Sequence, residues 1–143
     1  MLEQATAAFV QEARDILGDL EGQLLQLEQD PSPAQIDAIF RGLHTIKGSG
    51  AMFGYTALAR FTHHFENAYE MVRSGQLPVD RALIDLSLRA ADQMAAFLEL
   101  GGDGPEAEAL LASEPVTQLI AALVELCGVP ASPDNPPAIG GGG

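Results

Sequence analysis

The stretch Leu43–Gly54, LHTIKGSGAMFG, holds one of the three histidines of this 143-residue chain and, three positions later, its only lysine. Successive residues of an α-helix project about 100° apart, so residues three or four apart share a face. Apolar residues recur at this spacing through and before the stretch: Ile36, Ile39, Phe40, Leu43, Ile46 and Phe53. The pattern predicts an amphipathic helix whose apolar stripe faces a core.

The polar residues of this stretch gather beside the stripe. His44 lies roughly 120° around the helix from the centre of the stripe, at the edge of the buried face. Arg41, Lys47 and Gly48 lie one turn from it. A solvent-facing imidazole next to a cation and a missing side chain suits a transient phosphoryl group. His44 is then the nucleophile, Lys47 stabilises the phosphate, and Gly48 leaves room for the active site of a partner.

A carboxylate is expected beside His44 from the following helix. His44 precedes Gly54 by ten residues, and Glu66 follows it by twelve. In an antiparallel hairpin with a rise of about 1.5 Å per residue, the two side chains lie within roughly 3 Å of the same height. A carboxylate that accepts a hydrogen bond from Nδ1–H selects the tautomer with a free Nε2 and stabilises the cation that phosphorylation creates. We expect Glu66 to have this role.

The same residues carry a family resemblance. His44–Ser49, HTIKGS, resembles the phosphorylation motif of histidine phosphotransfer (HPt) domains. Phe53–Arg60, FGYTALAR, and His63–Glu66, HHFE, resemble the version of this domain at the N-terminus of the chemotaxis kinase CheA, also called P1. The resemblance covers residues 5–100 and weakens beyond them.

The resemblance implies a role for each matching residue. Nε2 of His44 would be the phosphorylated atom, Lys47 would stabilise the phosphate, and His63 would tune the site as a secondary member. The phosphoryl group would come from a histidine kinase catalytic domain that uses ATP. It would pass to an aspartate of a CheY-like response regulator, whose receiver domain supplies Mg²⁺.

Four residues are expected to serve the docking of these partners or to leave them clearance: Arg41, Gly48, Ala51 and Glu70. For Arg41 and Glu70, an ordinary surface ion pair explains the charges equally well.

The sequence offers no nucleotide site of its own, since it has neither a glycine-rich phosphate loop nor a carboxylate cluster suited to Mg²⁺. We therefore expect no cofactor and no metal in this domain. It is interpreted as a phosphocarrier of a parent protein that resembles a histidine protein kinase, and whether the chain itself counts as an enzyme stays open.

The amino-acid composition limits the classes of molecule that this chain is expected to bind and the compartment in which it acts. Twenty acidic against seven basic residues give a formal net charge of −13, which argues against nucleic acid and anionic membranes because both attract basic surfaces. A single cysteine, Cys127, excludes an internal disulfide and fits a reducing compartment. No apolar run is long enough for a membrane span, and no signal peptide is recognisable. We expect a cytoplasmic protein that is monomeric as an isolated domain.

The remaining periodicity predicts an all-α fold. Helices are expected over residues 3–29, 33–52, from 55 or 56 to 75, and 79–100, followed by a short helix over 105–112 and a last one over 115–127. These predict an antiparallel up-down four-helix bundle with an additional C-terminal helical segment packed on the fourth helix. The HPt bundle would span residues 1–127, with a core of 3–101 and the extra segment over 105–127. Residues 128–143, rich in proline and glycine, are expected to be a linker or tail.

Two other functions stay open. His44, His63 and Glu66 could meet around a metal, although di-iron bundles place several carboxylates in the bundle interior. A purely structural docking bundle would explain the helices, but the position of Lys47 beside His44 would then be a coincidence.

Overall fold

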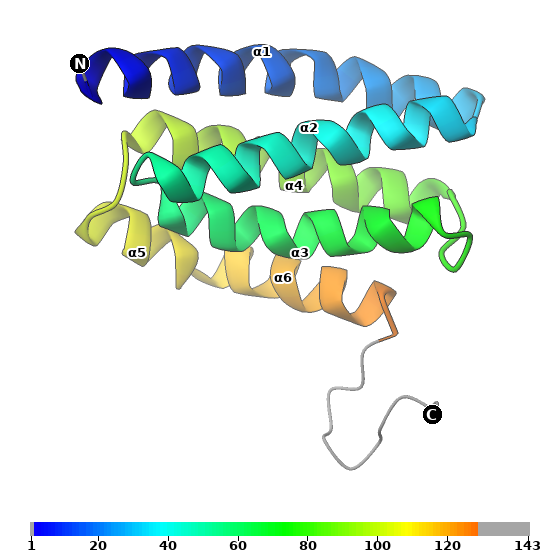
Figure 1. Cartoon of the computed structure of the whole chain (residues 1–143). Helices are drawn as coiled ribbons and strands as arrows, with labels where there is room; N and C mark the ends of the chain where they lie inside the picture. The colour runs from blue at the N-terminus through cyan, green and yellow to red at the C-terminus, as the bar shows by residue number, and fades with distance from the viewer. Residues whose placement is uncertain (1, 129–143) are drawn as a thin grey trace.

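The structure, a computed structural model, describes residues 2–128, and no strand occurs among them. These residues form six helices, which Figure 1 shows in chain order: α1 (Leu2–Gln29), α2 (Pro33–Met52), α3 (Thr56–Arg73), α4 (Arg81–Leu100), α5 (Pro105–Leu111) and α6 (Glu114–Leu126). The predicted tail lies outside the described residues except for Gly128.

Local caps explain where two of the helices begin. The Ser32 hydroxyl accepts a hydrogen bond from the Gln35 backbone N–H at 3.3 Å, and Pro33 occupies the first turn of α2. The Gln35 side chain donates to the carbonyl of Asp30 instead of reaching back to Ser32, so only half of a capping box forms. The Asp80 carboxylate caps the Leu83 N–H at 2.9 Å, which starts α4 at Arg81, two residues later than expected.

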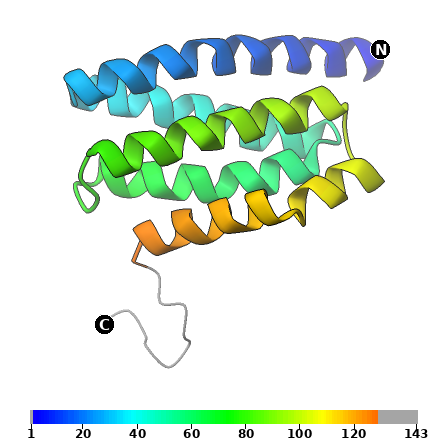
Figure 2. The same cartoon turned by 180° about the vertical axis from the view of Figure 1, so that it is seen from behind.

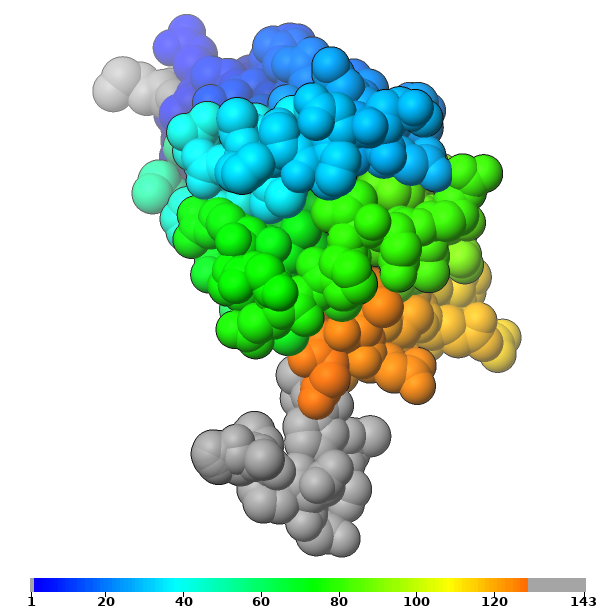
Figure 3. All heavy atoms as spheres, turned by 90° about the vertical axis from the view of Figure 1, so that its right-hand side faces the viewer, coloured from blue at the N-terminus to red at the C-terminus, as the bar shows by residue number. Residues whose placement is uncertain are grey.

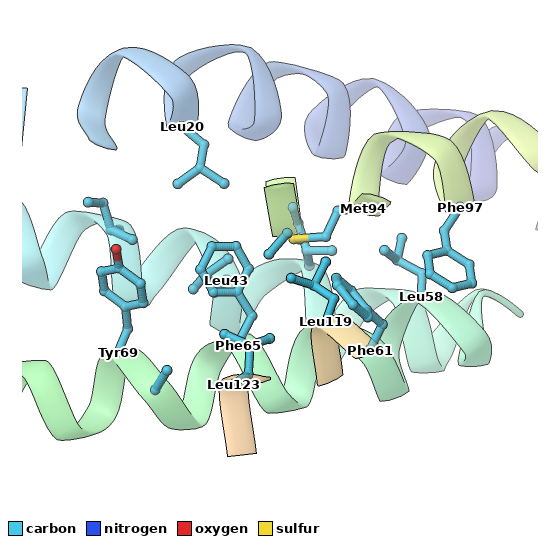
Figure 4. Close-up of a cluster of buried hydrophobic side chains, with 14 of the residues drawn as sticks. Leu20, Leu43, Leu58, Phe61, Phe65, Tyr69, Met94, Phe97, Leu119 and Leu123 are labelled. Atoms are coloured by element: carbon cyan, nitrogen blue, oxygen red, sulfur yellow. The ribbon is translucent and has the colours of Figure 1, made fainter. Parts of the chain in front are cut away.

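Helices α1 to α4 form the predicted antiparallel bundle, with each helix running opposite to the one before it (Figures 1 and 2). The centre of the bundle is filled by large apolar side chains from every helix of the bundle, and Figure 4 shows many of them, including Leu20, Leu43, Phe61, Phe65 and Met94. One polar pair lies in this core: Tyr69 and Ser87 oxygens are 2.8 Å apart. Because the Ser87 hydroxyl donates to the Leu83 carbonyl, Tyr69 is the donor to Ser87. Burial raises the pKa of Tyr69 to about 12 even though Ser87 hydrogen-bonds it.

The C-terminal segment forms two helices, as expected, with an angle of 51° between them. They pack on α4, as expected, and more extensively against α3, so they cover the groove between these two helices, with Val116, Leu119 and Leu123 buried. The end-on view shows α6 below α3 and α4, on the side away from α1 and α2 (Figure 3).

Within residues 2–128 no single helix is long and apolar enough to span a membrane, and only the bent pair of α5 and α6 reaches such a length and composition.

A distant carboxylate caps the start of α3. Asp103, in the loop between α4 and α5, accepts hydrogen bonds from the backbone N–H groups of Thr56 at 2.9 Å and Ala57 at 3.2 Å. It also accepts from the Thr56 hydroxyl at 2.7 Å, and its own N–H donates to the Gly54 carbonyl. Burial opposes ionisation of Asp103, but the hydrogen bonds from Thr56 and Ala57 prevail and lower its pKa. The cap therefore ties the α4–α5 loop to the α2–α3 turn.

Replacing Asp103 with alanine should lower the free energy of unfolding by about 1–2 kcal/mol, because the first turn of α3 loses its only side-chain cap. Asp103→Asn keeps an acceptor oxygen and should lose less. Urea unfolding followed by circular dichroism measures both values. An Asp103→Ala protein as stable as the wild type would show that this contact does not hold the loops together.

Candidate functional site

The turn between α2 and α3 sets the geometry of the site. Phe53, Gly54 and Tyr55 connect the two helices, and Gly54 has φ of 83°, a left-handed conformation that a residue with a side chain rarely adopts. The Tyr55 N–H donates to the Gly50 carbonyl at 2.8 Å and closes the turn. The two helices leave this turn antiparallel and side by side (Figure 1). His44 on α2 and Glu66 on α3 consequently reach the same height, as the residue count predicts.

Glu66 joins His44 and Lys47. Its Oε2 lies 2.6 Å from Nδ1 of His44, and its Oε1 lies 2.6 Å from Nζ of Lys47. The Glu66 side chain is only 7% exposed, against 29% for Lys47 and 64% for His44. The three side chains thus form a site with a buried carboxylate at its base and an exposed imidazole at its surface, which we call the His44 site.

The electrostatics of the His44 site select one form of the imidazole. Burial disfavours the Glu66 carboxylate, but hydrogen bonds and charge from Lys47 and His44 outweigh burial and lower the pKa of Glu66. An ionised carboxylate only accepts hydrogen bonds, so Nδ1 of His44 carries the proton. In the neutral ring, Nε2 then keeps its lone pair, on a side chain that is mostly exposed.

The residues expected to dock a partner or leave it clearance lie around this site. A Cβ built on Gly48 would meet no atom within 4 Å, so the surface one turn beyond His44 is open. Ala51 is exposed and lines a shallow groove of about 390 Å³ between the end of α2 and α3. Arg41 pairs with Asp37 at 3.1 Å, and Glu70 pairs with Arg73 at 2.9 Å. Within residues 2–128, neither Arg41 nor Glu70 forms a hydrogen bond or ion pair with the His44 site.

His63 lines the same groove as Ala51 and is not hydrogen-bonded to His44. Its Nε2 is 3.4 Å from the Asn67 side-chain amide, and its ring lies 5.9 Å from that of His64. In the described part of the chain, no hydrogen bond or ring pair joins His63 to His44. A tuning effect of His63 would have to act through space or through a docked partner.

The residue pattern did not reveal two contributors near His44. The Phe40 ring lies 6.2 Å from the His44 ring, with 14° between the planes, and the Arg73 guanidinium lies 4.0 Å from the centre of the Phe40 ring. Arg73 follows Glu66 by seven residues, which places both on one face of α3. That spacing places Arg73 on the Glu66 face of α3 but does not identify the Phe40 ring of α2 as its neighbour.

Metal ligands do not gather at this site. Among residues 2–128, no three His, Cys, Asp or Glu side chains are close enough together to hold a metal ion. His44 and Glu66 do meet, but the ammonium of Lys47 lies against the same carboxylate.

The lowered pKa of Glu66 predicts how stability depends on pH. The contribution of its ion pairs is complete above the pKa of an unfolded glutamate, about 4.3, and is lost as pH falls through the lower pKa of the folded protein. Between about pH 5 and 3, the unfolding free energy of the wild type should therefore fall more steeply than that of Glu66→Gln. Urea titrations at several pH values give both profiles, and parallel profiles would show that Glu66 is not the titrating group.

The sequence of this chain is similar to those of several bacterial chemotaxis proteins. Chemotaxis protein CheA of Treponema pallidum is 39% identical over 108 residues, which are 74% of this chain and 13% of that protein. CheA of Bacillus subtilis is 36% identical over 107 residues, with coverage of 72% and 16%, and CheA of Borreliella burgdorferi is 36% identical over 103 residues, with coverage of 71% and 12%. The chain therefore spans a small part of the length of these relatives.

A solved structure has the same fold. It is the phosphorylated P1 domain of CheA3 in complex with CheY6 from R. sphaeroides, with a TM-score of 0.70 and 26% identity. The match covers 88% of this chain and 99% of that one. The family model for the Hpt domain matches residues 4–126, almost the whole of the described chain. The helical bundle, the His44 site and these matches lead to one conclusion: the chain belongs to the Hpt domain family.

Proposed function

We propose that this chain is the phosphotransfer domain of a chemotaxis-type signalling kinase and that His44 carries the phosphoryl group. One observation supports this most: a buried carboxylate holds Nδ1 of an exposed imidazole and leaves Nε2 free. Of the three histidines, only His44 has such a carboxylate partner within residues 2–128. The chain carries the group between two active sites and has the role of a substrate for both.

The proposed loading step uses the lone pair of Nε2. It attacks the γ-phosphorus of ATP; the N–P bond forms while the bond from phosphorus to the bridging oxygen breaks, and that electron pair leaves with ADP. The ring gains a positive charge, which the Glu66 carboxylate stabilises through Nδ1–H. In the unloading step the N–P bond breaks, its electrons return to Nε2, and an aspartate oxygen of the regulator forms the new bond to phosphorus.

Lys47 and Gly48 are proposed to serve the phosphoryl group and the partner. The ammonium of Lys47 lies on Glu66 one turn from His44 and is partly exposed, so it is available to a phosphate on the ring. The open surface over Gly48 lets a second protein approach Nε2.

We propose two protein partners for this chain, a histidine kinase catalytic domain and a response regulator. We assign ATP to a histidine kinase catalytic domain, and Mg²⁺ to that domain and to the regulator. The structural neighbour was solved with CheY6, which supports a CheY-like receiver domain as the acceptor. The groove lined by Ala51 and His63, next to the His44 site, is a suitable place for it. We further propose that the isolated domain is a monomer and acts in the cytoplasm.

Replacing His44 with glutamine should abolish phosphorylation and leave the fold intact, because the side chain is mostly exposed. The measurement is incubation with a CheA-type catalytic core and labelled ATP, followed by a test for an acid-labile, base-stable phosphate. His63→Gln and His64→Gln are matched controls and should still be phosphorylated at His44. Histidine phosphate that persists in His44→Gln would contradict the proposal.

Replacing Gly48 with glutamine should slow transfer about tenfold or more, since the new side chain occupies the space that the partner needs. Glycine inside a helix is about 1 kcal/mol less favourable than alanine, so loss of stability cannot explain such a result. Gly22→Gln is the matched control, because a Cβ there also meets no atom within 4 Å and the residue is on α1, which contributes no side chain to the His44 site. Equal transfer rates for Gly48→Gln and the wild type would show that clearance is not the reason for this glycine.

A further inference from the structure

The His44 ring has a second contact besides Glu66. The Phe40 side chain, one turn earlier on α2, lies nearly parallel to the imidazole, at 14° and 6.2 Å between ring centres. A hydrogen bond at Nδ1 sets one direction of the ring but leaves rotation about that bond. An aromatic neighbour nearly parallel to the imidazole restricts this rotation.

Phe40 is in turn held by Arg73. The guanidinium of Arg73, from the last turn of α3, lies 4.0 Å from the centre of the Phe40 ring, within the range of a cation–π contact. Two carboxylates orient this guanidinium: Glu70 at 2.9 Å and Asp37 at 3.4 Å. Arg73 therefore bridges α3 to α2 on the side of His44 away from the turn.

We propose that Arg73 is a positioning residue for phosphotransfer: through Phe40 it fixes the plane of the His44 imidazole so that Nε2 stays aimed at the partner. The inference rests on the proposed function of His44. It adds a second support to the imidazole, beside the hydrogen bond with Glu66.

A direct role on the phosphoryl group fits the contacts less well. Arg73 already has Glu70 and Asp37 as partners, and its charge is largely balanced by them. Among the described residues it forms no hydrogen bond or ion pair with His44, Lys47 or Glu66. A stabilising role alone fits poorly as well, because the side chains in the ion pairs of Arg73 are about 40–50% exposed and such pairs contribute little to folding.

The test is a double-mutant cycle of Arg73→Ala and Phe40→Leu, with the rate of His44 phosphorylation by a CheA-type catalytic core as the readout. Arg73→Ala should lower kcat about two- to fivefold with KM unchanged, the factor that corresponds to an exposed cation–π contact. In the Phe40→Leu background the same change should have no further effect. Arg73→Lys, which keeps the charge but not the planar group, should restore only part of the rate.

Arg14→Ala is the matched control, since Arg14 is a half-exposed arginine in one ion pair with Glu99 and should leave the rate unchanged. An unchanged rate in Arg73→Ala, an effect confined to KM, or an equal effect in the presence and absence of Phe40 would each overturn the inference. NMR contacts between the Phe40 and His44 rings give a readout without phosphate. They should weaken in Arg73→Ala and persist in Arg14→Ala, and unchanged contacts would overturn the inference even if the proposed function failed.

Discussion

A buried carboxylate needs partners, and in this domain both partners of Glu66 come from α2. A charge with so little exposure is strongly unfavourable unless it is paired and hydrogen-bonded. His44 and Lys47 each contribute one short contact to it, on separate oxygens. This requirement fixes the height of α2 against α3 at the site. It also decides which nitrogen of His44 stays free, so the same contact serves the fold and the proposed chemistry.

The rest of the bundle keeps these two helices in place. The turn at Gly54 sets them antiparallel, and the Asp103 cap connects the start of α3 to the loop after α4. On the other side of α3, helices α5 and α6 cover the groove that it forms with α4. The mostly exposed imidazole of His44 therefore lies on a well-packed bundle, which suits the proposed exchange of a phosphoryl group between two partners.

The sequence predicted the parts that depend on local spacing. Helix periodicity located all six helices to within two residues at their starts, and counting from Gly54 was enough to pair His44 with Glu66. The contacts of Asp103 and Arg73 could not be found in this way, because each joins residues far apart in the chain and depends on side-chain reach. The sequence also predicted the packing of α5 and α6 on α4 but not their packing on α3, since an apolar face does not identify its neighbour.

The central claim is that Glu66 holds Nδ1 of His44 and leaves Nε2 to carry the phosphoryl group. The most direct measurement is NMR of the phosphorylated domain with ¹⁵N-labelled histidine rings. It should show coupling of ³¹P to Nε2 of His44 and a proton on Nδ1. Coupling to Nδ1, or to a ring nitrogen of His63 or His64, would contradict the account.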